Sequence, residues 1–302
     1  MPTQFKKLNN NQSKTKKKFK KLNCSPCVAN KKIIKNSCMT REALLKIRDE
    51  YNKDHPDSKI IALKPVLIWH ELKMKLDCSD ERCWVKEIDN KTLQAQIKNQ
   101  LFAPEHPPEW VNNKNEWLSN FDIDAVMKQY EEKDKTFEYL ATTPVDYDFI
   151  VNRSSNTCYT ETLCKFDLKS LMAAGKHKFA AVFNLDKHKQ SGSHWISLFI
   201  NAQLGIIMFF DSANGTMPTE VARFIKNVKQ QGIENGVKFK FLRNEKRHQR
   251  GNTECGVYAI HFIIEMLNNA NRAIELFLNG YIPDNKIEKY RKIYFNAPEK
   301  QE

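Results

Sequence analysis

The sequence lacks any apolar run long enough to cross a membrane. No stretch approaches the ~18 apolar residues of a membrane span, and the N-terminus lacks the apolar segment of a secretory signal peptide. We therefore expect a protein without a membrane span, made in the cytosol, whose eight cysteines are reduced thiols rather than the disulfides of a secreted scaffold. Hydrophobic residues make up 41% of the 302 residues, which is enough to bury a substantial core.

The first 35 residues contain no aspartate, glutamate or arginine. Their eleven lysines supply most of the net charge of +13 and leave only +2 for the rest of the chain. Because few apolar residues accompany them, residues 1–36 are predicted to form a disordered basic tail. Any binding to nucleic acid should therefore reside in this tail, through counterion release, and the alternative is a solvated arm without a partner.

Helical periodicity begins directly after the tail. Thr40 can cap a helix whose apolar residues recur at helical spacing, namely Ala43, Leu44, Ile47 and Tyr51. A second helix is predicted over roughly residues 59–76, and Pro65 indicates that it starts near that position. Prolines at 104, 107 and 108 then break the chain. We predict a helical N-terminal arm over residues 37–105 and a catalytic domain over residues 106–302.

The second part of the chain mixes helical and strand patterns. Asn120 or Asp122 can cap one helix, Pro218 opens another, and the nearly all-apolar residues 254–267 predict a buried helix. Short segments rich in Val, Ile and Phe predict strands over residues 178–186, 194–201, 205–211 and 237–241. The sequence contains no internal repeat. The expected fold class is therefore α+β.

Cys255 is predicted to lie in the first turn of the buried helix, directly after a polar loop. Unpaired N–H groups and the positive end of the helix dipole favour an anion there. A free thiol with a pKa of about 8.5 is only a few per cent ionised at neutral pH, so this placement favours Cys255 as a nucleophile. Gly256 would let a substrate backbone approach without meeting a side chain. The alternative is a buried structural cysteine.

A nucleophilic thiolate needs a histidine as general base and later as acid. His261 lies six residues along the same helix, about 240° around it, and should point away from Cys255. His194 follows a Ser-Gly-Ser segment and enters a predicted strand, so its ring can face a cleft. The other candidates lie in the N-terminal half or at the boundary (His55, His70, His106) or in Lys-rich loops that should be solvated (His177, His188).

Asp211 ends the next predicted strand, 17 residues after His194. A hairpin of residues 195–200 with 206–210, turning near 201–205, would bring both side chains to one edge of the sheet. That is the geometry in which a carboxylate can orient an imidazole. The alternative for Asp211 is a turn or cap residue.

The order of these residues is informative: His194-Trp195, then Asp211-Ser212, then Gln249 six residues before Cys255-Gly256. This order and spacing resemble the ubiquitin-like-protein-specific (deSUMOylating) cysteine proteases, and among them the virion-maturation proteases of asfarviruses and giant viruses. Residues 117–123 are similar to the segment that opens the family's catalytic domain, and residues 78–84 more weakly to the helical arm of the viral members. The resemblance covers about residues 106–302.

The resemblance implies roles that spacing alone does not supply. Gln249 would donate its side-chain N–H to the oxyanion beside the Cys255 backbone N–H, and the alternative is a loop glutamine in solvent. Trp117 and Trp195 would wall a narrow tunnel that admits only glycine before the scissile bond, and the alternative is ordinary aromatic core. Asp211 corresponds to a position that is Asn in some viral members. The implied fold is α+β, a papain-like cysteine protease fold of the deSUMOylating type.

The resemblance also implies a function. We expect a cysteine endopeptidase that cleaves after Gly-Gly-type sequences and processes viral structural polyproteins during particle maturation, located in the virion core and made in the host cytoplasm. The alternatives are a deSUMOylating or deubiquitinating isopeptidase acting on host conjugates and, from another class, a non-catalytic nucleic-acid-binding core protein. No cofactor is expected. No metal is expected either, because the possible zinc ligands match no ordinary finger spacing (Cys24, Cys27, Cys38, Cys78, Cys83).

Overall fold

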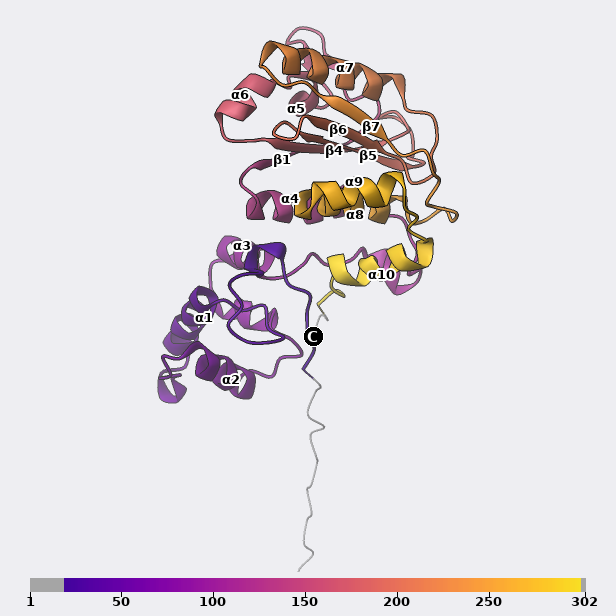
Figure 1. Cartoon of the computed structure of the whole chain (residues 1–302). Coiled ribbons are helices and arrows are strands. Elements are labelled where there is room, and N and C mark those ends of the chain that lie inside the picture. The colour runs from indigo at the N-terminus through magenta and orange to yellow at the C-terminus, as the bar shows by residue number, and fades with distance from the viewer. Residues whose placement is uncertain (1–18, 300–302) are drawn as a thin grey trace, which may run out of the picture.

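The computed structural model describes residues 19–299 and contains two bodies (Figure 1). The smaller body is the N-terminal arm, and the larger body is a sheet covered by helices on both faces. No helix within residues 19–299 is long and apolar enough to span a membrane.

The arm is built from three helices: α1 (Arg41–Asp54), α2 (Pro65–Lys75) and α3 (Lys91–Leu101). The Thr40 side chain accepts a hydrogen bond from the backbone N–H of Ala43 at 3.2 Å, and the four apolar residues predicted to face the core are buried. The predicted start of α2 at Pro65 is confirmed. Helix α3 was not predicted, although Asn90 caps it. Short 3-10 turns lie before the first helix, η1 (Pro26–Val28), and within the arm, η2 (Pro56–Ser58) and η3 (Cys83–Glu87). A further turn, η4 (Pro108–Val111), follows the arm.

The prediction that residues 1–36 form a disordered tail can be compared with the structure only in part. Residues 1–18 lie outside the described residues. Residues 19–36 differ from the prediction, because they pack on the arm: Leu22 and Val28 join its core, and the Phe19 ring stacks on Trp84 at 5.5 Å. Average composition did not reveal this, since a few apolar side chains among many lysines are sufficient to anchor the segment.

The cysteines also differ from expectation. Six of them pair as Cys24–Cys38, Cys78–Cys83 and Cys158–Cys164, with Cα atoms 5.1, 5.8 and 6.8 Å apart. Turns and short connections bring these residues together, which the sequence spacing did not reveal. Cys27 and Cys255 are free thiols. Within residues 19–299 no group of three or more His, Cys, Asp or Glu side chains could hold a metal ion.

The main sheet has the strand order β1-β4-β5-β6-β7. Strands β4 (Lys178–Asn184), β5 (Trp195–Asn201) and β6 (Ile206–Phe210) are antiparallel neighbours, and β1 (Phe137–Pro144) and β7 (Lys240–Arg243) flank them in parallel. The predicted hairpin is confirmed, with Ser197 opposite Phe210. Strand β1 was not predicted, and β7 begins later than expected. A separate two-stranded sheet pairs β2 (Ile150–Asn152) with β3 (Thr157–Cys158).

Helices cover both faces of the main sheet (Figure 1). On one face lie α4 (Asn120–Lys133), α8 (Cys255–Asn268) and α9 (Ala270–Leu278), and on the other α5 (Glu161–Cys164), α6 (Leu168–Ala173) and α7 (Thr219–Glu234). Alternate residues of β6 divide between the two cores: Phe210 packs with the α8 cluster and Phe209 with the α7 cluster. Ser119, not Asn120 or Asp122, caps α4, and Asp122 completes the capping box.

The C-terminal segment joins the two bodies. After α10 (Asp284–Tyr294), Asn296 pairs with the backbone of Pro104 and His106 at 2.7 and 2.8 Å, and its side chain accepts from the N–H of Asn23. Glu299 forms ion pairs with Lys86 and Lys98 in the arm. The arm is therefore attached at the boundary and also through the last described residues.

Candidate active site

Cys255 begins helix α8 and is 2% exposed. Among the described residues no side chain caps this helix, because the N-cap residue Glu254 turns its carboxylate back to Thr253, where it accepts from Oγ1 at 2.6 Å. The first N–H groups of α8 are therefore not occupied by a capping side chain. An anion beside Cys255 would be stabilised by these groups and by the helix dipole.

His194 lies where β5 begins, and its ring contacts both Asp211 and Cys255. Its Nε2 lies 2.6 Å from Oδ1 of Asp211, which leaves Nδ1 as the ring nitrogen for proton exchange with Cys255. Burial by itself would lower the pKa of His194, but hydrogen bonds and charge interactions with Asp211 and Cys255 outweigh it and raise the pKa to about 9. The resting arrangement therefore favours a protonated imidazole.

Asp211 is buried and firmly held. Its carboxylate accepts from the backbone N–H of Ala213 at 2.9 Å and of Gly215 at 2.6 Å, as well as facing His194. Burial raises the pKa of this carboxyl, but the contact with His194 and the backbone donors outweigh it and lower the pKa below its usual value. The Asn244 side-chain amide forms two hydrogen bonds with the Asp211 backbone: it accepts from the N–H at 3.0 Å and donates to the carbonyl at 2.7 Å. Sequence reasoning missed Asn244, since a polar residue after a strand carries no distinctive signal.

Gln249 is 2% exposed, which excludes the alternative of a loop glutamine in solvent. Its Oε1 accepts from the Ser212 hydroxyl at 2.7 Å, so the amide nitrogen is turned the other way, and Nε2 donates to the Gly251 carbonyl at 3.1 Å. The backbone N–H of Gln249 also donates to the Ser212 carbonyl at 2.8 Å. Ser212, adjacent to Asp211, thereby links the loop before Cys255 to the end of β6.

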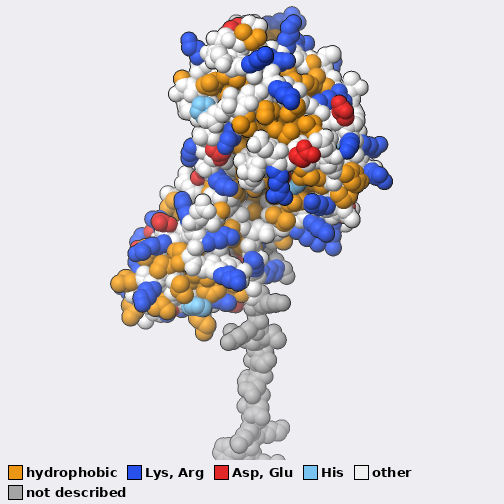
Figure 2. Space-filling view, viewed as in Figure 1, with side chains coloured by type: hydrophobic (Ala, Val, Ile, Leu, Met, Phe, Trp, Pro, Cys, Tyr) orange, Lys and Arg blue, Asp and Glu red, His pale blue; other side chains and the backbone are white. Residues whose placement is uncertain are grey.

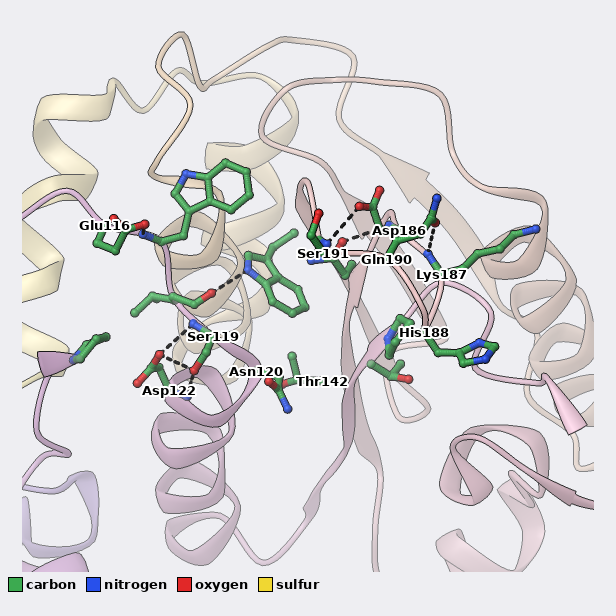
Figure 3. Close-up of a pocket in the computed structure, with 18 of the residues that line it drawn as sticks. Glu116, Ser119, Asn120, Asp122, Thr142, Asp186, Lys187, His188, Gln190 and Ser191 are labelled. Atoms are coloured by element: carbon green, nitrogen blue, oxygen red, sulfur yellow. Dashed lines mark hydrogen bonds between the residues drawn. The ribbon is translucent and has the colours of Figure 1, made fainter. Parts of the chain in front are cut away.

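The two tryptophans line a cleft of about 720 Å³. Figure 3 shows the start of α4, with Ser119 and Asp122, on one side and the loop with Asp186 and Ser191 on the other. Trp195 is 8% exposed and donates its Nε1–H to the Leu118 carbonyl at 2.9 Å, so it belongs to the core and lines the cleft as well. Trp117 is 37% exposed, which does not fit the alternative of a core residue.

The atoms nearest to Gly256 belong to side chains of the protein, whereas a substrate backbone was predicted to lie there. A Cβ at this position would lie 3.1 Å from Cβ of Leu118 and 3.3 Å from Cδ1 of Trp195. The missing side chain therefore lets Leu118 and Trp195 pack closely on the start of α8.

Two of the other histidines have contacts that bear on the predictions made for them. His261 points away from Cys255 as predicted and contacts the Tyr294 hydroxyl at 2.7 Å; burial, then Lys286, lower its pKa to about 4. His188 was expected to be solvated but makes defined contacts instead. It pairs with Asp146 at 2.7 Å, its ring lies against Phe149, and it lines the cleft.

Arg291 of α10 is a further residue at the site that the sequence did not reveal. It is 5% exposed and donates to the carbonyls of Glu116 at 2.8 Å and Thr253 at 2.5 Å. Glu116 directly precedes Trp117, and Thr253 lies two residues before Cys255. One guanidinium therefore connects the two loops that border the site. Burial lowers the pKa of Arg291, and its charge interacts favourably with Glu254 and Cys255.

A cysteine at a helix N-terminus, a protonated imidazole in contact with its sulfur and a carboxylate behind that imidazole form the machinery of a cysteine protease. Sequence comparison agrees. Residues 178–300 match the Ulp1 protease family, C-terminal catalytic domain. The expected α+β fold of the deSUMOylating type is thereby confirmed, and the non-catalytic alternative is not supported.

Viral proteins are among those similar to this chain. A protein of Acanthamoeba polyphaga mimivirus, named as a thiol protease, is 28% identical over 232 residues, covering 75% of this chain and 72% of the relative. A cysteine protease of African swine fever virus is 27% identical over 260 residues, covering 81% and 92%. The crystal structure of the African swine fever virus protease superposes with a TM-score of 0.64 at 21% identity, over 93% of this chain and 97% of that one. The shared fold therefore includes the arm.

Proposed function

We propose that this protease is an endopeptidase that cleaves after Gly-Gly-type sequences and processes viral structural polyproteins during particle maturation. The observation that carries the proposal is the cleft: Trp117, Trp195 and Gly192 line it, and His194 directly precedes Trp195. Trp195 also lies against Gly256, the residue after the nucleophile, so aromatic walls leading to this position would exclude side chains and admit glycine. The viral origin of the relatives supports a role in particle assembly, with the enzyme made in the host cytoplasm and acting in the virion core.

The proposed mechanism uses the side chains already described. The thiol proton of Cys255 resides on the His194 ring, and the resulting thiolate attacks the carbonyl carbon of the second glycine. Gln249 Nε2 and the Cys255 backbone N–H would hold the oxyanion, and His194 then protonates the departing amine. Water then attacks the thioester and gives a proton to His194, the carboxylic acid product leaves, and the thiolate–imidazolium pair is restored. Asp211 holds the ring throughout.

The alternative is an isopeptidase that removes a ubiquitin-like protein from host conjugates. One observation favours it: relatives from African swine fever virus isolates are named SUMO-1 cysteine proteases. Both substrates present a Gly-Gly-type sequence, so the cleft alone does not distinguish them.

The discriminating experiment offers both substrates to the purified protein. We expect viral structural precursors to be cut, with new N-termini that follow Gly-Gly-type sequences, and Cys255→Ala to leave them intact. Cleavage of ubiquitin-like conjugates with no cleavage of viral precursors would establish the isopeptidase. New N-termini that follow other sequences would contradict the proposed specificity.

A further inference from the structure

Helix α2 of the arm is apolar on two sides, and only one side faces the core. Ile68 and Leu72 are fully buried. On the other side, Val66, Leu67 and Met74 are 42%, 51% and 80% exposed. A helix that is apolar all round is normally covered by protein or lipid, so the exposed side of α2 requires an explanation.

The extended segment that leads into α2 repeats this pattern. Ile60 is buried, whereas Ile61 and Leu63 are 86% and 74% exposed, as expected for residues that alternate between two faces. We call the exposed residues of this segment and of α2 the α2 face; they are Ile61, Leu63, Val66, Leu67 and Met74. Figure 2 shows hydrophobic side chains among Lys and Arg at this end of the arm.

Lysines lie along the α2 face. Residues 59–75 contain four exposed lysines and one acidic residue, Glu71, and Asp57 and Asp77 lie just outside this segment. The chain also enters the described structure beside α2, where the Phe19 ring lies 5.9 Å from Trp69 and Nζ of Lys73 lies 4.9 Å from both ring centroids. The 18 residues that precede Phe19 in the sequence contain six lysines and no acidic residue.

We propose that the α2 face docks on the surface of a lipid bilayer that contains anionic lipids. Exposed aliphatic side chains beside clustered lysines combine the two signals that peripheral membrane binding needs: apolar insertion and attraction to acidic headgroups. A nucleic acid would neutralise the lysines but offers no apolar surface for the aliphatic side chains. A second copy of the chain would bring two sets of lysines together.

The test uses the full-length protein and flotation with phosphatidylcholine vesicles, with and without phosphatidylserine. We expect binding only when phosphatidylserine is present, weakening with added salt. The double variant Leu63→Gln/Leu67→Gln should reduce binding by about tenfold or more, and Lys59→Glu/Lys64→Glu should act in the same direction. The matched control is Ile233→Gln, which changes an exposed isoleucine (70%) on α7 and should bind like wild type.

Melting temperature and cleavage of a Gly-Gly reporter should be unchanged in all these variants, so a loss of vesicle binding is not a loss of folding. The proposal is overturned if the protein does not bind phosphatidylserine vesicles, or if the leucine variant binds them as well as wild type. If wild type binds no vesicles, and both wild type and the leucine variant bind duplex DNA, the partner is nucleic acid instead. If wild type is a dimer that binds no vesicles and the leucine variant is a monomer, the partner of the α2 face is a second copy of the chain.

Discussion

Nε2 of His194 lies 2.6 Å from Oδ1 of Asp211, although the two residues stand at the ends of different strands. The β5–β6 hairpin brings them to one edge of the sheet, and the Asn244 amide holds the Asp211 backbone there. The ring that faces Cys255 is thus positioned by a chain of buried hydrogen bonds rather than by a flexible loop.

The raised pKa of His194 predicts a particular pH dependence. Activity with a Gly-Gly reporter should fall on the alkaline side with an apparent pKa of about 9, because His194 must be protonated to release the amine. A pKa above the ordinary 6.5 also means that the folded protein binds this proton more tightly than the unfolded chain. This contribution to stability is complete below pH 6.5 and is lost as the pH rises through about 9. An alkaline limb near pH 6.5 would contradict the assignment.

Two substitutions at Asp211 separate orientation from charge. Asn can still accept the imidazole N–H, so Asp211→Asn should retain much more kcat/KM than Asp211→Ala. Removing the negative charge should also move the alkaline limb to lower pH in both variants, because Asp211 helps to raise the pKa of His194. Both variants must melt like wild type. Equal damage in both would show that orientation alone is insufficient, and no damage in either would leave Asp211 as a turn residue.

Gln249 is predicted to stabilise the oxyanion. Gln249→Ala should lower kcat by roughly 10²- to 10³-fold with little change in KM, the usual cost of losing one such donor. Gln249→Glu keeps the acceptor for Ser212 but offers no N–H donor, so it should be no better. Steady-state kinetics of the two variants decide the role, and near-normal kcat in both would refute it.

Arg291 is predicted to position the site rather than to react. Arg291→Met leaves the Glu116 and Thr253 carbonyls without this donor and should destabilise the fold by about 1–3 kcal/mol while also lowering kcat/KM. Arg291→Lys keeps the charge but cannot donate to both carbonyls in the same geometry, so it should recover stability better than activity. Denaturant unfolding and steady-state kinetics separate the two effects. If both variants keep wild-type kcat/KM, Arg291 serves stability alone.

The sequence predicted best those features that depend on strong local patterns. The buried helix α8 and the β5–β6 hairpin have runs of apolar residues between clear turn signals, and the candidate catalytic side chains lie at the ends of these elements. Strand β1 pairs with the sheet on one side only and has a weak pattern, so it was missed. Asn244 and Arg291 act through partners far away in the sequence, and the packing of Phe19 depends on Trp84. No local signal reports such contacts.

The most direct test of the account is labelling with an electrophilic mimic of a Gly-Gly peptide. Cys27 and Cys255 are the two free thiols of the structure, so each can be replaced by alanine as the control for the other. We predict that wild type and Cys27→Ala are labelled at Cys255 and cleave the reporter equally. Cys255→Ala should melt like wild type, remain unlabelled and lose cleavage. Cleavage at the wild-type rate by Cys255→Ala would contradict the account.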